Sequence, residues 1–310
     1  MPHFLTVTPN PAVDVSTSVD EVVGSHKLRC AAPDVHPGGG GVNVARVLHR
    51  LGADVLALHT AGGPSGERLS RLLAQEQVPA QALPIAGETR ESFTVRETSS
   101  GREFRFVLPG PTVTEPEWQG WLAAVRALPQ APAYIVASGG LPPGTPEDFY
   151  ARLARLARER GSRMVIDSAG APLAAALEEG VWLAKPSLRE LRGLTGLPLE
   201  TAQDRHEAVL ALVKGGRAQR VALSLGAEGA LYASARTVLR APSLPVAVVS
   251  TVGAGDSFLG GLLWALDRAP DDEEQAFRNA MGAGTAALLA PGTAVSGAER
   301  GRRLAGQVQG

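Results

Sequence analysis

Short apolar runs alternate with longer amphipathic segments along most of the chain. The plainest runs have the length and composition of buried β-strands, and they lie at 133–138 (AYIVAS), 163–167 (RMVID), 181–186 (VWLAKP) and 220–225 (RVALSL). Segments with helical periodicity separate these runs. Such an alternation predicts an α/β fold in which a mostly parallel sheet is covered by helices on both faces.

The segment 146–160 (PEDFYARLARLARER) is the plainest of the expected helices. Its apolar positions recur with helical spacing and share one face. Thr145 is expected as the N-cap, Pro146 at the first helical position and Gly161 just after the end, because these residue types favour those positions.

Two stretches break the alternation of strands and helices. The stretch 92–110 places apolar residues at alternate positions on both sides of a Ser-Ser-Gly turn, which predicts an antiparallel hairpin. The stretch 13–30 has the pattern of extended chain with turns. We expect both to form a small accessory β-sheet. No internal repeat or low-complexity linker divides the chain, so we expect a single domain.

Composition limits the classes of partner. The 310 residues carry a formal net charge of −1, so no overall basic field favours nucleic acid or an anionic membrane. Cys30 is the single cysteine, which excludes an internal disulfide and fits a reducing compartment. The N-terminus lacks the regions of a signal peptide, and glycine and proline interrupt the longest uncharged run, 279–298. We expect a soluble, cytoplasmic protein.

The stretch 250–258 (STVGAGDSF) carries the clearest candidate chemistry. The run 244–249 (LPVAVV) before it predicts a short strand, and 259–266 (LGGLLWAL) after it predicts a helix. The glycines at 253 and 255 therefore lie at a strand-to-helix turn. Uncovered N–H groups and the helix dipole favour an anion at such a turn.

Asp256 falls in the first turn of this expected helix. Aspartate is common there for capping and dipole reasons alone, which leaves a purely structural role open. Beside a glycine-rich cradle, however, a carboxylate can remove a proton from a hydroxyl while the cradle stabilises a transferring phosphoryl group. The combination therefore favours a catalytic base.

Three other clusters place polar or glycine residues after expected strands. Four glycines, 38–41, precede Asn43 and a helix, but they lack the third glycine of a dinucleotide fingerprint, and no Walker-type P-loop occurs. Each glycine costs roughly 0.5–1 kcal/mol relative to alanine in regular structure, so we expect a ligand to approach the backbone there. Asp14 follows the first expected strand, and the segment 185–190 (KPSLRE) follows a later one.

The segments PGGGGVNVARVLHRLG and STVGAGDSFLGGLL, at opposite ends of the chain, resemble the two signatures of the PfkB/ribokinase family of carbohydrate kinases. The resemblance covers nearly the whole chain, and TPNPAVD, KLRC and REFRFVLPG are similar to the phosphofructokinase and tagatose-kinase branch. It implies a ribokinase-like three-layer α/β sandwich, with one domain over 1–310 and lid segments at about 13–36 and 88–110. It also implies a homodimer.

The implied activity is transfer of the ATP γ-phosphate to a primary hydroxyl of a ketohexose phosphate, with Mg²⁺ and K⁺ as cofactors. Fructose 6-phosphate giving fructose 1,6-bisphosphate, a glycolytic step, is the favoured reaction. The nearest alternatives are 1-phosphofructokinase and tagatose-6-phosphate kinase activity, although 1-phosphofructokinases usually carry lysine at the position of Gly40. Intact Asp256 disfavours an inactive sugar-phosphate sensor. A nucleoside kinase is disfavoured because a nucleoside carries no phosphate group for Lys27, Arg29 and Arg90 to bind.

The resemblance also implies roles for individual residues. The base would be Asp256, and the anion hole would be formed by Gly253, Ala254 and Gly255. The sugar-binding positions would be Asp14, Lys27, Arg29, Gly39, Gly40, Asn43, Arg90, Gly140 and Asp256. The nucleotide-binding positions would be Lys185, Ser187, Glu190, Ser224, Gly226, Gly229, Thr251, Gly253, Gly255, Met281 and Thr285. The loop around a monovalent cation would include Ser250, Val252, Ala287, Ala290 and Gly292.

Two positions depart from the family pattern. Ser187 stands where the family usually has asparagine, and this residue helps to position Mg²⁺ largely through water. Gly140 stands where a serine commonly contacts the substrate phosphate, so a hydroxyl donor is lost there. Both departures bear on how the phosphates are held.

Overall fold

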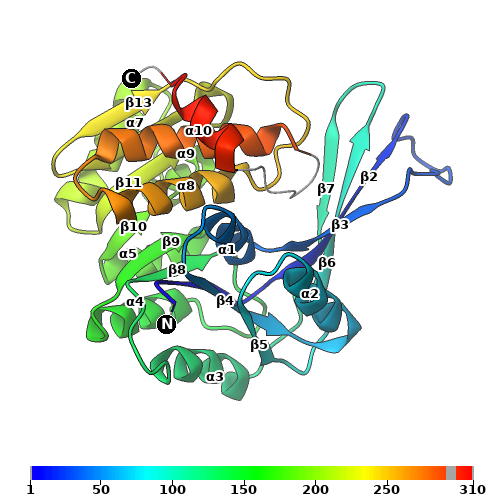
Figure 1. Cartoon of the computed structure of the whole chain (residues 1–310), viewed down its shortest axis with the longest axis horizontal. Helices are drawn as coiled ribbons and strands as arrows, with labels where there is room; N and C mark the ends of the chain where they lie inside the picture. Colours follow the sequence, from blue (N-terminus) through cyan, green and yellow to red (C-terminus); the bar gives the residue numbers. More distant parts are fainter. Residues whose placement is uncertain (1, 291–297, 309–310) are drawn as a thin grey trace.

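The computed structural model describes residues 2–290 and 298–308 of the chain (Figure 1). In this part a nine-stranded sheet forms the centre of the molecule. Its strands follow the spatial order β13 (Val238–Ala241), β12 (Ala230–Ser234), β11 (Ala218–Ser224), β10 (Val181–Ala184), β9 (Arg163–Asp167), β8 (Tyr134–Ser138), β1 (Phe4–Thr8), β4 (Val55–Ala61) and β5 (Ala80–Pro84). From β11 to β5 the neighbours are parallel, whereas β12 and β13 pair antiparallel at one edge. The parallel strands therefore end at a common edge.

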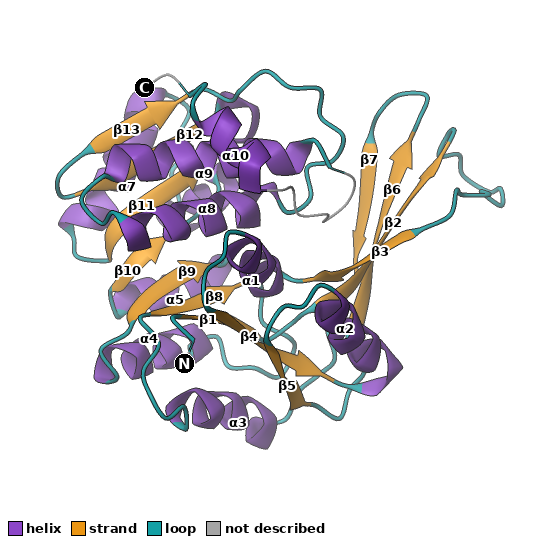
Figure 2. Ribbon diagram, viewed as in Figure 1, coloured by secondary structure: helices purple, strands orange, loops and turns teal. Residues whose placement is uncertain are grey.

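Helices cover both faces of this sheet (Figure 2). One apolar core joins it to α1 (Gly40–Arg50), α2 (Gly63–Gln75), α8 (Ala254–Arg268) and α9 (Glu273–Leu288), and α10 (Ala298–Ala305) packs on α9. A second core joins the other face to α3 (Glu115–Arg126), α4 (Phe149–Glu159), α5 (Gly170–Glu178), α6 (Leu188–Thr195) and α7 (Ala202–Lys214). The predicted α/β fold class is confirmed. In the described ranges, no helix combines the length and apolar character needed to cross a membrane.

A second sheet of four strands, hereafter the small sheet, projects from one end of the large one (Figures 1 and 2). Its order is β3 (Asp34–Gly38), β2 (Ala12–Val19), β6 (Arg90–Glu97) and β7 (Glu103–Val107). Strands β6 and β7 form the antiparallel hairpin expected from the sequence, with Phe93 opposite Phe106. Strand β2 pairs parallel with β6 and antiparallel with β3.

The two faces of the small sheet differ in polarity, because successive residues of a strand point to opposite faces. Asp14, Ser92 and Arg105 occupy alternate positions on the face that lines a cleft against the large sheet. Phe93 and Phe106 lie on the opposite face, where Phe106 is 52% exposed. The small sheet therefore presents a polar surface inward and an apolar surface outward.

The segment 244–249 does not form the expected strand. The chain runs without regular structure from 242 to 253, after β13 has ended. Pro242 and Pro245 have no N–H group to donate to a strand neighbour, which makes a sheet ladder unfavourable here. The segment instead reaches α9, where the Val249 N–H donates to the Leu288 carbonyl at 2.7 Å.

Helix α4 begins at Phe149 rather than at the expected Pro146, and Asp148 rather than Thr145 occupies the N-cap. The N–H groups of Thr145 and Phe149 donate to carbonyls three residues earlier, at Pro142 and Pro146. These bonds close two turns ahead of the helix. Pro146, expected at the first helical position, therefore belongs to the preceding loop.

Candidate active site

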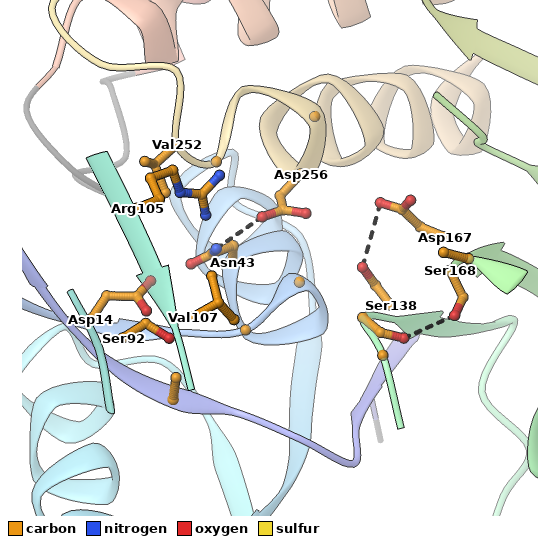
Figure 3. Close-up of a pocket in the computed structure, with 18 of the residues that line it drawn as sticks. Asp14, Asn43, Ser92, Arg105, Val107, Ser138, Asp167, Ser168, Val252 and Asp256 are labelled. Atoms are coloured by element: carbon orange, nitrogen blue, oxygen red, sulfur yellow. Dashed lines mark hydrogen bonds between the residues drawn. The ribbon is translucent and has the colours of Figure 1, made fainter. Parts of the chain in front are cut away.

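A cleft of about 370 Å³ lies where the parallel strands end and the small sheet projects (Figure 3). It brings together most of the residues that the sequence singled out, although they come from six separate parts of the chain. The expected residues that line it are Asp14, Gly39, Gly40, Asn43, Arg90, Gly140, Lys185, Glu190, Thr251, Val252, Gly253, Gly255 and Asp256. In open α/β sheets, ligands bind at this end of the strands.

The N-terminus of α8 forms one wall of the cleft. Gly253 is the N-cap in the left-handed conformation, with φ of 76°, and it turns the chain into the helix. The N–H groups of the first turn have no intrahelical acceptor and are available to an anion. A side chain at Gly255 would stand 3.5 Å from the Lys185 Nζ, so glycine keeps this ammonium open to the same space. The arrangement suits a phosphate group.

Asp256 projects from this first turn into the cleft. The carboxylate accepts a hydrogen bond from the Asn43 Nδ2 at 2.8 Å (Figure 3). Burial raises the pKa of Asp256, while the Asn43 hydrogen bond and the Lys185 charge act in the opposite direction. A carboxylate with a raised pKa is a better proton acceptor than an ordinary aspartate, which suits a general base.

The glycines at 38–41, of which Gly40 and Gly41 are the first two residues of α1, pack against the protein itself rather than solely leaving room for a ligand. A side chain at Gly38 would overlap the Asp14 carboxylate, and one at Gly40 would overlap the Ser138 hydroxyl. Gly41 is equally close to Thr8. The expectation that ligand approach explains these glycines is therefore incomplete, because the ends of β1 and β8 already occupy the space.

Asp14 lies within β2 rather than in the loop after the first strand. Burial raises its pKa to about 6, against the lowering effect of Arg105, Arg90 and Arg46. The side chain faces the cleft from the small sheet (Figure 3). A carboxylate in this position can accept hydrogen bonds from hydroxyl groups of a sugar.

Arg90 lines the cleft but also ties the two sheets together. Its guanidinium donates to the carbonyls of Asn10 and Leu108 at 3.0 Å each, and to that of Pro11 at 3.4 Å. Arg105, which sequence reasoning did not single out, also faces the cleft from β7 (Figure 3). Its only sequence signal is its place between Phe104 and Phe106 in an alternating strand.

Lys185 and Asp167 form a buried ion pair at the opposite wall, with Nζ and Oδ1 3.0 Å apart. Burial alone would lower the pKa of Lys185, but Asp167 more than offsets this and keeps the ammonium charged. Sequence reasoning missed Asp167, although an acidic residue at the end of the buried run RMVID was a usable signal. Asp167 thus holds the Lys185 ammonium beside the N-terminus of α8.

Ser187 and Glu190 form a capping box at the start of α6. The Ser187 hydroxyl accepts from the Glu190 N–H at 3.3 Å, and the Glu190 carboxylate accepts from the Ser187 N–H at 2.8 Å. Glu190 lines the cleft, whereas Ser187 is not among the residues that line it. The departure at Ser187 is thus compatible with helix capping. At Gly140 a side chain would meet open space, so the departure there relieves no steric conflict.

The remaining expected residues lie outside the lining of the cleft. Lys27 and Arg29 are exposed on the loop between β2 and β3, and Ala254 follows Gly253 in α8. Ser224 ends β11, Gly226 begins the short 3₁₀ turn Gly226–Glu228, and Gly229 follows it. Met281 and Thr285 are buried on α9, which packs along α8. Of these five positions, Ser224 adjoins the Lys185 segment, because its N–H donates to the Pro186 carbonyl at 3.0 Å.

The segment before α8 contacts both α9 and the small sheet. The N–H groups of Val249 and Ser250 donate to the Leu288 carbonyl, which brings Ser250 beside the end of α9, where Ala287 lies and after which Ala290 follows. From the small sheet, the Arg96 guanidinium donates to the Val249 carbonyl at 3.0 Å. Glu103 accepts from the N–H and the hydroxyl of Thr251, at 3.2 and 3.1 Å. Gly292 lies outside the described residues.

Comparisons with known proteins agree over nearly the whole chain. The family model described as pfkB family carbohydrate kinase matches residues 10–299. An ATP-dependent 6-phosphofructokinase isozyme 2 from Mycobacterium tuberculosis is 43% identical, over 94% of this chain and 86% of the relative. The protein of the same description from Escherichia coli is 38% identical over 94% of each chain. The structure of phosphofructokinase-2 from Escherichia coli in complex with potassium superposes with a TM-score of 0.92 at 35% identity, over 99% of both chains. The tetrameric inhibited form of the same protein superposes with a TM-score of 0.90 at 34% identity, also over 99% of both chains.

Proposed function

The chain belongs to the pfkB family of carbohydrate kinases, and from this premise we propose that it is an ATP-dependent 6-phosphofructokinase. It transfers the γ-phosphoryl group of ATP to the free primary hydroxyl of fructose 6-phosphate and yields fructose 1,6-bisphosphate and ADP. The 43% identity to a 6-phosphofructokinase over 94% of the chain is the observation that carries the choice of acceptor.

The geometry of the cleft supports three roles in this reaction: a proton acceptor, a site for the transferring phosphoryl group and a site for the sugar phosphate. Asp256 takes the proton of the acceptor hydroxyl, whose oxygen then forms a bond to the γ-phosphorus as the bond to ADP breaks. The N–H groups at the start of α8 and the Lys185 ammonium stabilise charge on the transferring group. Asp14 and Asn43 hold sugar hydroxyls, and Arg105 and Arg90 attract the sugar phosphate.

The carboxylates on the Lys185 side fit a magnesium ion. Glu190 and Asp167 offer oxygen atoms, which Mg²⁺ prefers, on the wall that would face the nucleotide phosphates. Mg²⁺ held there would neutralise phosphate charge. We assign a potassium ion to the segment 249–252 and the end of α9, because the Val249 and Ser250 N–H groups donate to the Leu288 carbonyl and hold the two stretches side by side. A related structure that contains potassium supports this assignment.

The outer face of the small sheet supports assembly into a homodimer. Phe93 and Phe106 are exposed there, beside the hairpin end that carries Leu108. Large apolar side chains gathered on one sheet face are typical of a protein interface. A second copy of the chain would cover them.

Competing sugar phosphates test the proposed acceptor. We expect kcat/KM to be at least about tenfold higher for fructose 6-phosphate than for fructose 1-phosphate or tagatose 6-phosphate, measured with saturating magnesium-ATP, because misplaced phosphate or hydroxyl groups leave charged partners unpaired. A higher value for either competitor would reassign the substrate within the same family. An absence of turnover with all three, in a chain that still binds ATP, would contradict kinase activity on ketohexose phosphates.

A further inference from the structure

Arg46 is a fully buried arginine next to the active site, and the reaction as described gives it no role. Its side chain has no exposed surface. The guanidinium forms two hydrogen bonds to the Glu76 carboxylate, at 2.9 Å through Nε and 2.5 Å through Nη2. Its Nη1 donates to the Pro37 carbonyl and to the Asn43 Oδ1, each at 3.2 Å. The charge therefore lies between the end of α2 and the first turns of α1.

The contact between Arg46 and Asn43 determines which way the Asn43 carboxamide faces. A guanidinium has donors and no acceptor, so the atom it contacts must be the amide oxygen. The amide nitrogen then points away from Arg46, toward Asp256. An ionised carboxylate only accepts, so it requires this orientation. A flipped amide would place oxygen against the Asp256 carboxylate and nitrogen against the guanidinium, and it would lose both bonds.

We propose that Arg46 is a positioning residue for the catalytic base: anchored by Glu76, it holds the Asn43 amide so that Nδ2 donates to Asp256. The proposal rests on the role of Asp256 in the proposed function. The ordered sequence of contacts is Glu76 to Arg46, Arg46 to Asn43, and Asn43 to Asp256. Asn43 and Asp256 line the cleft and are placed to touch substrate, whereas Arg46 and Glu76 are not among the residues that line it.

The cost of burying a charge supports a specific purpose for Arg46. A buried ion pair is often no more stable than an apolar pair of the same volume, so stability alone is a weak reason for it. The planar fork of arginine can hold a carboxylate with two nitrogens while a third contacts the amide, which lysine cannot reproduce. Arg50 also contacts Glu76, at 3.3 Å, but from a side chain that is 39% exposed.

The hydrogen bond from Asn43 favours the ionised form of Asp256 and so lowers its pKa, in opposition to burial. Other charged groups face Asp256 from the neighbouring elements, and they are Lys185, Asp167, Glu190, Asp14 and Arg105. Protonation of the base removes activity, so Asp256 contributes to the acid limb of kcat/KM. Asp14, whose pKa burial raises to about 6 and Arg46 lowers, contributes to the same limb. The side-chain signals of Asn43 distinguish the two carboxylates.

The first measurement is the pH profile of kcat/KM for fructose 6-phosphate in Arg46→Met, Arg46→Lys and Arg50→Met. We expect Arg46→Met to move the acid limb upward by about one pH unit, because a hydrogen bond to the ionised form is lost. Arg46→Lys should give a smaller shift, since it can still donate to the Asn43 Oδ1. Arg50→Met is the matched control and should leave the limb in place. If Arg46→Met does not fold, Glu76→Gln releases the anchor and should shift the limb in the same direction.

The second measurement observes the amide itself and does not need activity. The chain has three asparagines, at 10, 43 and 279, so ¹⁵N-asparagine labelling gives three side-chain NH₂ signals that single substitutions can assign. We expect the Asn43 signals to titrate together with Asp256, and Arg46→Met to change them while Arg50→Met does not. Loss of turnover in the wild type would contradict the proposed function but leave this readout intact.

Three outcomes would overturn the proposal. A limb that shifts while the Asn43 signals stay unchanged would assign the effect to charge acting at a distance. Changed Asn43 signals with an unchanged limb would separate the amide from the base. An equal loss of kcat at every pH, with neither signal moved, would leave Arg46 a purely structural residue.

Discussion

Among single side chains, Asp256 is the one on which the proposed reaction depends most. We expect Asp256→Asn to lower kcat by at least ~10²-fold with little change in the KM for ATP, because an amide cannot accept the hydroxyl proton. Asp267→Asn is a matched control, since Asp267 lies on the same helix but pairs with His3 at 2.6 Å. Equal kcat in the wild type and in Asp256→Asn would remove this carboxylate from the mechanism.

Among the residues of the candidate site, those at a turn are easier to predict from the sequence than those whose orientation depends on strand register. Gly253, Gly255 and Asp256 follow from the chemistry of a helix N-terminus, and all three line the cleft. Arg105 was missed because its side chain faces the cleft only through the register of the β6–β7 pair, which leaves no short motif to recognise. Asp167 was missed although it ends the buried run RMVID, where β9 pairs with β8.

At the scale of elements, the segment 249–252 lies between the end of α9 and the small sheet and leads directly into α8. A potassium ion bound to its carbonyls would order this segment and with it the N–H groups at the start of the helix. We expect potassium to raise kcat several-fold over sodium or lithium at constant ionic strength, with little change in the KM for the sugar phosphate. Steady-state rates with saturating magnesium-ATP check this. Identical rates in potassium and in a large organic cation would show that the segment needs no ion.

Element boundaries show where local patterns are insufficient. Buried strands such as β9 begin and end where the apolar run does, because both faces of a central parallel strand need apolar residues. The run 244–249 is as apolar as these, yet it forms no strand, since two prolines in and beside it remove donors and no neighbour pairs with it. Helix α4 begins at Phe149 and not at the predicted Pro146, because proline favours turns as well as helix starts.

At the scale of the whole molecule, the apolar outer face of the small sheet predicts a dimer. We expect Phe106→Lys to convert the dimer to a monomer at micromolar concentration, because a charge would be buried without a partner at the interface. Light scattering coupled to size-exclusion chromatography measures the mass. Leu197→Lys is the control, since Leu197 is 54% exposed, close to the 52% of Phe106, but lies on another surface. A monomeric wild type, or a mass unchanged by Phe106→Lys, would contradict this assembly.

The small sheet is built from two excursions of the chain, 12–38 and 90–107, that leave the large sheet and return to it. On the proposed assignments these excursions carry Asp14, Arg90 and Arg105, whereas the proton acceptor and the nucleotide side belong to the large domain. The charged groups that recognise the acceptor are thus concentrated in two short stretches, whereas Asn43, which also holds sugar hydroxyls, lies on α1. Recombination or drift in two short stretches can change the sugar a descendant uses while its phosphotransfer machinery is inherited intact. A family built this way can diversify its substrates without reinventing its chemistry.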